Sequence, residues 1–152
     1  MILSLGESEA SESVRSFPLT VPGQTAVPGF SLSLWTDILE RWTIDQLALD
    51  PWTALLDADR AGRQLLVRRW EPGDRFVPLG MSGHKKLQDF FVDAKVPRHQ
   101  RGTVALVVSG GEIAWVVGFR VDDRFKVTES TRRILRVCAA SRERQEQDSV
   151  GL

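Results

Sequence analysis

Basic side chains gather in the stretch from residue 68 to residue 101 of this sequence. The stretch holds eight of them: Arg68, Arg69, Arg75, Lys85, Lys86, Lys95, Arg98 and Arg101. The same stretch has only four acidic side chains, which are Glu71, Asp74, Asp89 and Asp93. Guanidinium and ammonium groups at this density can bind phosphates, including those of a nucleic-acid backbone. The alternative is a solvated surface with ordinary ion pairs, such as Lys85 with Asp89 one helical turn away.

Catalytic and metal-binding patterns are absent from the sequence. It contains neither G-x-x-x-x-G-K-[ST] nor G-x-G-x-x-G, the glycine-rich loops that bind nucleotide phosphates. His84 and His99 have no cysteine or carboxylate at metal-ligand spacing, and Cys138 is the single cysteine. Asp57 and Asp59 form a D-x-D that is better explained as a strand end or a helix cap. We therefore predict no catalytic residue, no metal site and no cofactor in this chain.

The two parts of the chain differ in charge, although the formal net charge is zero. Residues 1–59 have nine acidic and two basic side chains, a net charge of −7. Residues 60–152 have eighteen basic and eleven acidic side chains, a net charge of +7. An anionic partner for the second part is one explanation. Attraction between the two parts within one fold is the other, and charge alone does not decide between them.

Short strands and turns are expected to position the basic residues. Alternating or β-branched apolar residues predict strands over 17–21, 30–35, 53–58, 65–70, 103–108, 112–117 and 133–138. Pro72 followed by Gly73 is the pair that a type II turn requires. Gly80 and Gly83 indicate a loop over residues 78–83. Gly110 and Gly111 give the clearest hairpin signal in the chain.

The strongest helix signal covers residues 84–95. At 100° per residue, one face of that helix is apolar and comprises Leu87, Phe90, Phe91 and Ala94. The spacing also places Lys85 and Lys86 in the first turn, where the helix dipole disfavours each cation by about 0.3–1 kcal/mol. Such a local conflict is expected where function overrides stability. The helix start, the two ammonium groups and the preceding glycine loop are therefore predicted to form a phosphate receptor.

Size and composition fit a small cytoplasmic domain. A chain of 152 residues can bury about two-thirds of its unfolded surface, so a core without disulfide or metal is feasible. No apolar run is long enough to span a bilayer. Residues 1–15 do not have the basic and then apolar pattern of a signal peptide.

Several sequence blocks resemble one known family. Residues 66–81, LVRRWEPGDRFVPLGM, resemble the "vR…GDr..PlGm" signature of the C-terminal domain of tRNA(Ile)-lysidine synthetase. Residues 85–91, KKLQDFF, are similar to that family's "kKLkdfF". Residues 95–101 and 113–118, then Arg120 and Thr131, follow in the family's order. The resemblance covers residues 53–138, and residues 17–52 resemble more weakly the segment that precedes this domain in the same enzymes.

The resemblance implies an α+β fold and a tRNA-binding role. The domain is expected to be a small, sandwich-like β domain with one main amphipathic helix, similar to a module of phenylalanyl-tRNA synthetase, preceded by a short β-rich segment. Enzymes of the family use ATP and Mg²⁺ to attach lysine to the wobble cytidine of tRNA(Ile), in an N-terminal catalytic domain that this chain lacks. Their S-G-G-x-D-S pyrophosphate loop is matched only in its opening by residues 109–111, which join two predicted strands and are expected to form a turn. The chain alone is therefore expected to be inactive.

Domain boundaries, partners and contacts complete the expectations. The boundaries are a disordered or truncated lead-in over 1–16, a β-rich segment over 17–52, the family domain over 53–138 and a disordered tail over 139–152. RNA-backbone contacts are assigned to Arg68, Arg75, Lys85, Lys86, Lys95, Arg98, Arg101 and Arg120, and loop-shaping roles to Gly73, Asp74, Gly80 and Gly83. The implied partners are tRNA(Ile) and the catalytic N-terminal domain, with no membrane. The alternative is a protein-interaction module that docks on a separate catalytic domain or forms a homodimer.

Overall fold

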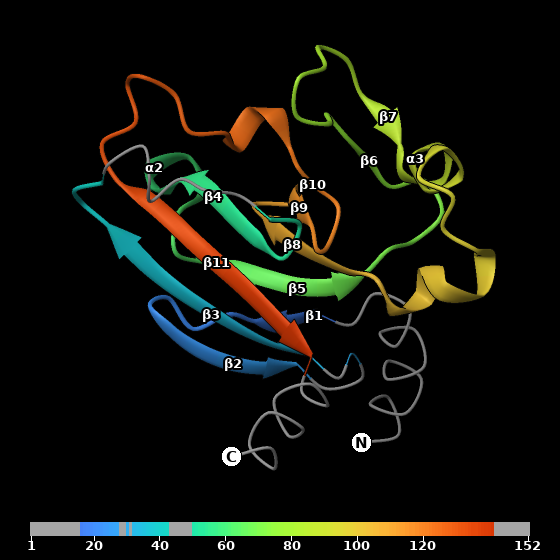
Figure 1. Ribbon diagram of the computed structural model, residues 1–152, viewed down its shortest axis with the longest axis horizontal. Coiled ribbons are helices and arrows are strands. Elements are labelled where there is room, and N and C mark those ends of the chain that lie inside the picture. The colour runs from blue at the N-terminus through green and yellow to red at the C-terminus, as the bar shows by residue number, and fades with distance from the viewer. Residues whose placement is uncertain (1–15, 28–29, 31, 43–49, 142–152) are drawn as a thin grey trace, which may run out of the picture.

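Two packed antiparallel β-sheets form the centre of the computed structural model, which describes residues 16–27, 30, 32–42 and 50–141 (Figure 1). The first sheet has five strands in the order β1-β5-β8-β9-β10. The second has four strands in the order β2-β3-β11-β4, and a two-stranded sheet pairs β6 with β7. The expected α+β class with a sandwich-like β domain is confirmed.

The elements are short. The first sheet comprises β1 (Ser16–Pro18), β5 (Leu65–Arg69), β8 (Ala105–Ser109), β9 (Glu112–Val116) and β10 (Arg120–Val121). The second comprises β2 (Gly23–Val27), β3 (Leu32–Leu39), β4 (Thr53–Asp57) and β11 (Ile134–Ser141). The remaining elements are β6 (Arg75–Phe76), β7 (Lys85–Lys86), the helices α2 (Ala58–Ala61) and α3 (Leu87–Asp93), and the 3-10 helices η2 (Arg98–Thr103) and η3 (Asp123–Phe125).

The main core lies between the two large sheets. Val67, Val107 and Trp115 of the first sheet belong to the same buried cluster as Leu34 and Val137 of the second. Burying a side chain of this size stabilises the fold by about 1.5–3 kcal/mol. The sandwich is therefore the rigid base on which the other elements lie.

A second core covers the opposite face of the five-stranded sheet. Leu106 and Val116 of that sheet pack in one buried cluster with Leu87, Phe90 and Phe91 of α3. Because β8 and β9 are buried on both faces, their sequences are continuous apolar runs rather than alternating ones. The predicted apolar face of the helix is confirmed for these three residues, whereas Ala94 is exposed at the end of α3.

The predicted start of this helix is wrong. Lys85 and Lys86 form β7, which pairs with Arg75 and Phe76 of β6, and α3 begins only at Leu87. The backbone of Lys86 is extended, with φ −63° and ψ 135°, and the amide of Leu87 donates to the carbonyl oxygen of Asp74 at 2.8 Å. The hairpin therefore takes the two lysines out of the helical turn, and α3 is too short to supply the expected phosphate receptor.

The turns follow the glycine signals. Gly73 has φ 97°, and the amide of Asp74 donates to the carbonyl oxygen of Glu71 at 3.0 Å, as in the predicted type II turn. Gly110 and Gly111 have φ 58° and 84° between β8 and β9, which is the backbone of a two-residue hairpin turn. Residues 109–111 thus form a turn and not a phosphate-binding loop before a helix.

Strands that precede residue 53 in the sequence, where the family domain was expected to begin, pair with strands that follow it. β1 pairs with β5, and β3 pairs along its whole length with β11. Residues 17–27 and 32–39 are consequently part of the sandwich formed by 53–138, and β11 continues to Ser141. Most of the expected lead-in and tail, together with residues 43–49, lies outside the described residues.

Candidate nucleic-acid interface

The elements β6, β7, α3 and η2 lie together beside one face of the five-stranded sheet, and we call them the outer layer (Figure 1). Of the eight predicted RNA contacts, five lie on its elements and Lys95 lies between α3 and η2. Arg68 lies in β5 beneath this layer, and Arg120 in β10 lies next to it.

Arg68 is bound to a carboxylate. Its two terminal nitrogens donate to the two carboxylate oxygens of Asp74 at 2.9 and 3.0 Å. The side chains are only 18% and 15% exposed, and Asp74 also accepts from the backbone amide of Glu71 at 2.7 Å. This geometry fixes the turn that begins β6, so Arg68 and Asp74 hold the outer layer against the sheet.

Lys85 is also paired, but not with the residue suggested by the helix spacing. It forms an ion pair with Asp93 at the end of α3 rather than with Asp89. Its side chain is 26% exposed. The pair joins β7 to α3 and leaves Lys85 partly neutralised.

The other six predicted contacts have no ion pair among the described residues, and all but the half-buried Arg101 are exposed. They are Arg75, Lys86, Lys95, Arg98, Arg101 and Arg120. Two of them lie against aromatic rings: Arg101 is 5.9 Å from the ring centre of Phe91, and Arg120 is 5.9 Å from that of Phe90. These contacts hold each guanidinium in place without neutralising it.

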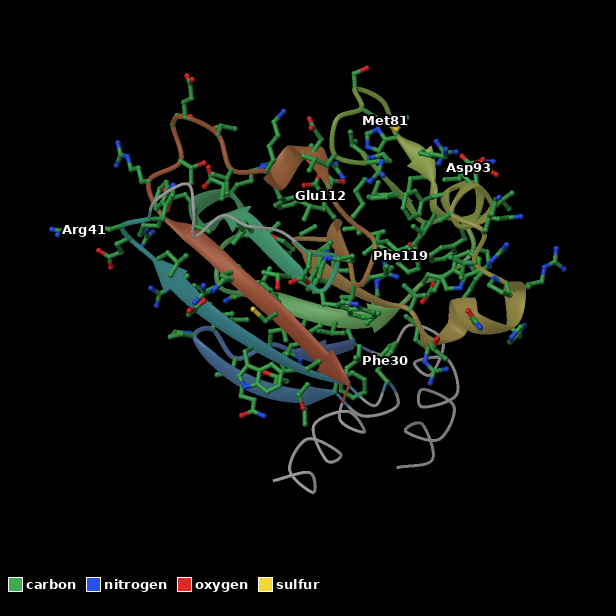
Figure 2. The ribbon with its side chains drawn as sticks, in the orientation of Figure 1. Phe30, Arg41, Met81, Asp93, Glu112 and Phe119 are labelled. Atoms are coloured by element: carbon green, nitrogen blue, oxygen red, sulfur yellow. The ribbon has the colours of Figure 1, made fainter. Side chains whose placement is uncertain are left out.

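Basic residues elsewhere on the sandwich are mostly paired with carboxylates. The pairs are Arg60 and Arg124 with Glu112, Arg124 with Asp122, Lys126 with Asp123, Arg133 with Asp59 and Arg136 with Asp37. The exceptions in the described part of the chain are Arg41, Arg63, Arg69 and Arg132, which lie outside the outer layer. Unpaired positive charge is thus concentrated on and beside the outer layer, where blue nitrogen atoms surround α3 and η2 in Figure 2.

One pair of like charges stands directly opposite across the small hairpin. Arg75 of β6 is the cross-strand partner of Lys86 of β7, and both are exposed. Like charges in this position destabilise a hairpin, by about 0.2–1 kcal/mol. The conflict between local stability and charge therefore persists in the structure, but it arises from a strand pairing and not from a helix start.

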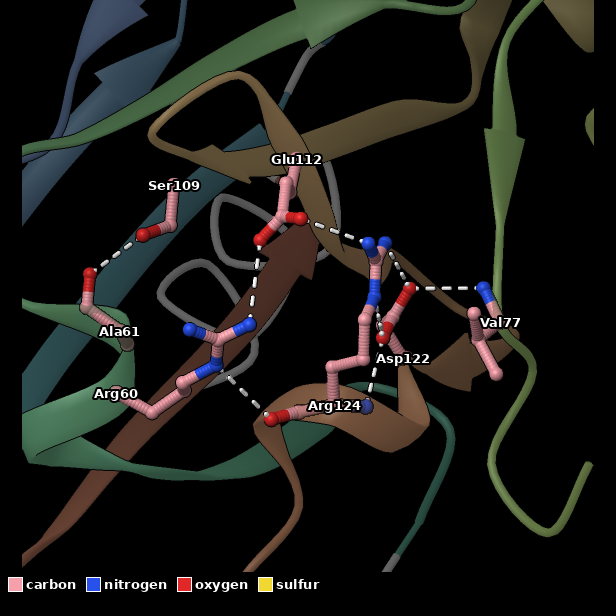
Figure 3. A network of polar contacts seen from close by, with 7 residues as sticks. All are labelled: Arg60, Ala61, Val77, Ser109, Glu112, Asp122 and Arg124. Carbon is pink, nitrogen blue, oxygen red and sulfur yellow. Dashed lines mark hydrogen bonds and ion pairs between the residues drawn. The ribbon is translucent and has the colours of Figure 1, made fainter. Parts of the chain in front are cut away.

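A buried carboxylate fixes the loop that precedes β7 (Figure 3). Asp122 is fully buried, accepts from the backbone amide of Val77 at 2.8 Å, and accepts from Nε and Nη2 of Arg124 at 3.0 and 2.9 Å. The hydrogen bond from Arg124 to Asp122 raises the pKa of the arginine above its usual value. The neighbouring Asp123 accepts from the amide of Gly80 at 3.1 Å, and this bond, with that from Lys126, lowers its pKa.

Sequence reasoning missed these contacts, and the signal for them was the pair of adjacent acids, Asp122 and Asp123, directly after β10. Of the loop glycines, Gly80 has φ 91°, a conformation that favours glycine, whereas Gly83 does not have a positive φ. Gly80 is therefore needed for the path of the loop, while nothing within 4 Å of a Cβ at Gly83 restricts that position.

Comparisons with known proteins agree on one family. Residues 65–138 match the TilS substrate C-terminal domain. A tRNA(Ile)-lysidine synthase from Symbiobacterium thermophilum is 41% identical over 137 residues, which are 89% of this chain and 27% of that protein. The chain belongs to the tRNA(Ile)-lysidine synthase family through this C-terminal domain. A second relative with the same name, from Dehalococcoides mccartyi, is 50% identical over 84 residues, 55% of this chain and 18% of that protein.

The fold of the TilS C-terminal domain has also been solved. A structure described as the crystal structure of the TILS C-terminal domain matches 83% of this chain and 95% of its own, with a TM-score of 0.71 and 26% identity. The chain spans between 17% and 27% of the length of the curated relatives it matches.

Neither a membrane-spanning helix nor a metal-binding cluster is found in the described parts of this TilS C-terminal domain. No described helix is long and apolar enough to cross a bilayer. No three His, Cys, Asp or Glu side chains of the described residues are grouped as a metal ion would need.

Proposed function

We propose that this chain is the tRNA-binding part of a tRNA(Ile)-lysidine synthase, and that it binds phosphates and riboses of duplex RNA. A-form RNA has a deep and narrow major groove that side chains cannot read, so backbone contacts dominate its recognition. Such binding needs exposed cations on a preformed surface more than it needs a deep cleft. The outer layer has these properties.

The observation that supports this proposal is the separation of paired from unpaired cations. Six basic residues on and beside the outer layer have no carboxylate partner among the described residues, whereas most of those on the sandwich have one. A surface that serves only solubility has no need of this separation. The cross-strand pair of Arg75 and Lys86 supports the same conclusion, because it lowers the stability of the hairpin.

The eight predicted contacts are assigned different roles in this proposal. Arg75, Lys86, Lys95, Arg98, Arg101 and Arg120 bind the RNA backbone directly. Lys85 is a weaker contact because Asp93 partly neutralises it. Arg68, with Asp74 and Gly73, positions the first turn of the outer layer, and Gly80 shapes the loop before β7.

The ligase chemistry belongs, in this proposal, to a catalytic domain outside the chain. ATP and Mg²⁺ would bind there, because residues 109–111 form a hairpin turn that does not fit a pyrophosphate loop. That domain would be the chain's natural partner, and the chain would hold tRNA(Ile) for it. Incorporation of lysine into tRNA by this chain with ATP alone would contradict the assignment.

The experiment compares two double variants by fluorescence anisotropy with labelled tRNA(Ile) at several salt concentrations. Lys86→Ala/Arg98→Ala removes two unpaired cations of the outer layer. It should weaken binding and lower the salt slope of log K by about 1.4–1.8, which is 0.7–0.9 for each phosphate. The matched control, Arg63→Ala/Arg132→Ala, removes two exposed and unpaired cations elsewhere. If both double variants lose the same amount of tRNA affinity, only the net charge of the protein matters for binding, and the outer layer has no special role.

A further inference from the structure

A pocket of about 410 Å³ lies between the loop before β7, helix α3 and the turn that joins β9 to β10. Met81, Lys85, Phe90, Asp93, Phe119 and Arg120 are among the residues that line it. Figure 2 labels three of these residues: Met81 on the loop, Asp93 at the end of α3, and Phe119 between the outer layer and the sandwich. The pocket therefore opens beside the unpaired cations of the proposed RNA interface.

One wall of the pocket is an exposed aromatic ring in a fixed position. Phe119 is 37% exposed, and its ring packs edge-to-face against Phe90 and Phe91, with ring centres 6.2 Å apart in both pairs. Met81, which also lines the pocket, is 43% exposed. Two exposed apolar side chains in a pocket that is also lined by charged residues are suited to a flat, apolar group with polar edges.

The polar groups of the pocket are two cations and one carboxylate. Arg120 lies over the ring of Phe90 and has no ion pair among the described residues, whereas Lys85 is paired with Oδ2 of Asp93. The Asp93 side chain is 63% exposed, and its Oδ1 accepts no hydrogen bond from the described residues. The pocket thus offers a cation for a phosphate and a free carboxylate oxygen for a hydrogen-bond donor.

We infer that this pocket binds one unpaired nucleotide of an RNA, with its base against Phe119 and Met81 and its phosphate at Arg120. The free oxygen of Asp93 then accepts a hydrogen bond from the base. Cytosine and adenine present an exocyclic amino group for such a bond, whereas uracil has only its N3–H, which lies between two carbonyl oxygens that repel a carboxylate. Unstacked bases of RNA are typically bound in this way, on an aromatic side chain with their edges hydrogen-bonded.

The occupant is an RNA nucleotide rather than a peptide because Arg120 belongs to both surfaces. It lines the pocket and is also one of the six unpaired cations, so a strand bound along the outer layer passes the pocket mouth. This inference rests on the proposed RNA binding and adds a site for an unpaired residue to a surface that otherwise binds duplex backbone.

The test uses the 152-residue chain and three labelled RNAs at one salt concentration. The RNAs are a blunt duplex, the same duplex with a 3′ overhang of four cytidines, and the same duplex with a 3′ overhang of four uridines. The duplex has about 12 base pairs, which is of the order of one contact site on double-stranded RNA. The cytidine overhang should tighten binding about tenfold over the blunt duplex, since one base stacks on an aromatic side chain. The uridine overhang should bind about fivefold more weakly than the cytidine overhang, because the two carbonyl oxygens beside the N3–H of uracil repel the carboxylate of Asp93.

Two variants locate the effect. Phe119→Leu keeps an apolar side chain but removes the ring, so it should abolish most of the gain from either overhang and leave the blunt duplex unaffected. Asp93→Asn can donate as well as accept, so it should bring the ratio of cytidine to uridine affinity close to one. The substitution also removes one negative charge beside Lys85, but this change strengthens the binding of both RNAs equally and leaves their ratio unchanged.

The outcomes separate this site from the proposed function. If the blunt duplex binds and neither overhang tightens binding, the pocket does not bind a nucleotide, although the proposed RNA interface stands. The same conclusion follows if the gain survives in Phe119→Leu. If only the overhang RNAs bind and the blunt duplex does not, the duplex-binding proposal fails and the pocket stands.

Discussion

Replacing Lys86 by aspartate should make the protein more stable while weakening its binding to tRNA. Lys86 is the N-cap residue of α3 and makes no side-chain hydrogen bond to the helix, and it stands opposite Arg75 across the hairpin. An aspartate at this position can accept from the first amides of the helix and attract Arg75. A single substitution thus relieves both local conflicts and removes one proposed phosphate contact.

The gain in stability can be estimated from its parts. An aspartate N-cap stabilises a helix by about 1 kcal/mol, and an opposite-charge cross-strand pair adds about 0.2–1 kcal/mol. Repulsion from Asp89, three residues along the helix, offsets a few tenths of a kcal/mol. The net gain is about 1 kcal/mol, which raises Tm by about 2–4 °C for a chain of this size. The affinity for tRNA should fall about tenfold, and the salt slope of log K by about 0.7–0.9.

The assay pairs thermal melts followed by circular dichroism with anisotropy titrations of labelled tRNA(Ile). Arg63→Asp is the matched control, since it makes the same change in charge at an exposed and unpaired residue outside the outer layer. It should leave the salt slope unchanged. If Lys86→Asp raises Tm and binds tRNA as the parent protein does, Lys86 is a surface residue without a role in RNA binding. A fall in Tm would refute the reasoning about the N-cap.

Three further predictions follow from the site. Asp74→Asn should destabilise the protein by about 2–3 kcal/mol in urea unfolding, because it leaves the largely buried guanidinium of Arg68 without a carboxylate. If Arg68→Met binds tRNA as tightly as the parent protein does, at temperatures where both are folded, this arginine only positions the turn. Lys95→Gly should raise stability by about 1 kcal/mol in the same assay, since Lys95 has φ 61°, and should lower tRNA affinity severalfold; unchanged affinity would remove Lys95 from the interface. The pKa of Asp123 lies below its ordinary value of 3.8, so the contribution of its carboxylate to stability is complete above that pH and is lost as the pH falls through the lowered value. The Tm of Asp123→Asn should therefore depend less on acid pH than the Tm of the parent protein does, and an identical dependence would exclude this role.

Local patterns predicted the parts of the fold that depend on neighbours in sequence. The apolar runs of β8 and β9 and the two glycines between them predicted the hairpin, and Pro72 with Gly73 predicted the type II turn. Phe90 and Phe91 were correctly assigned to a buried helix face. In each case the signal lies within a few residues of the structure that it specifies.

The errors and omissions concern contacts between distant residues. The two-residue strands β6 and β7 are too short to have a period of their own, so helical spacing was extended back over Lys85 and Lys86. Asp122 accepts a hydrogen bond from the amide of Val77, which is 45 residues away in the sequence, and no spacing rule connects the two residues. Sequence reasoning therefore found where the cations are concentrated, but it did not show which of them are paired with carboxylates.

The place of β11 in its sheet has a consequence for biosynthesis. This strand contains residues 134–141 and lies between β3 and β4, which were made about 80 to 100 residues earlier and do not pair with each other. A nascent polypeptide that has not yet exposed these residues to solution has two apolar strands with open edges, a state prone to aggregation. Ribosomes that stall before the codon for Ile134 would release a product that cannot close its sandwich, so the domain can fold only after residues 134–141 have been made.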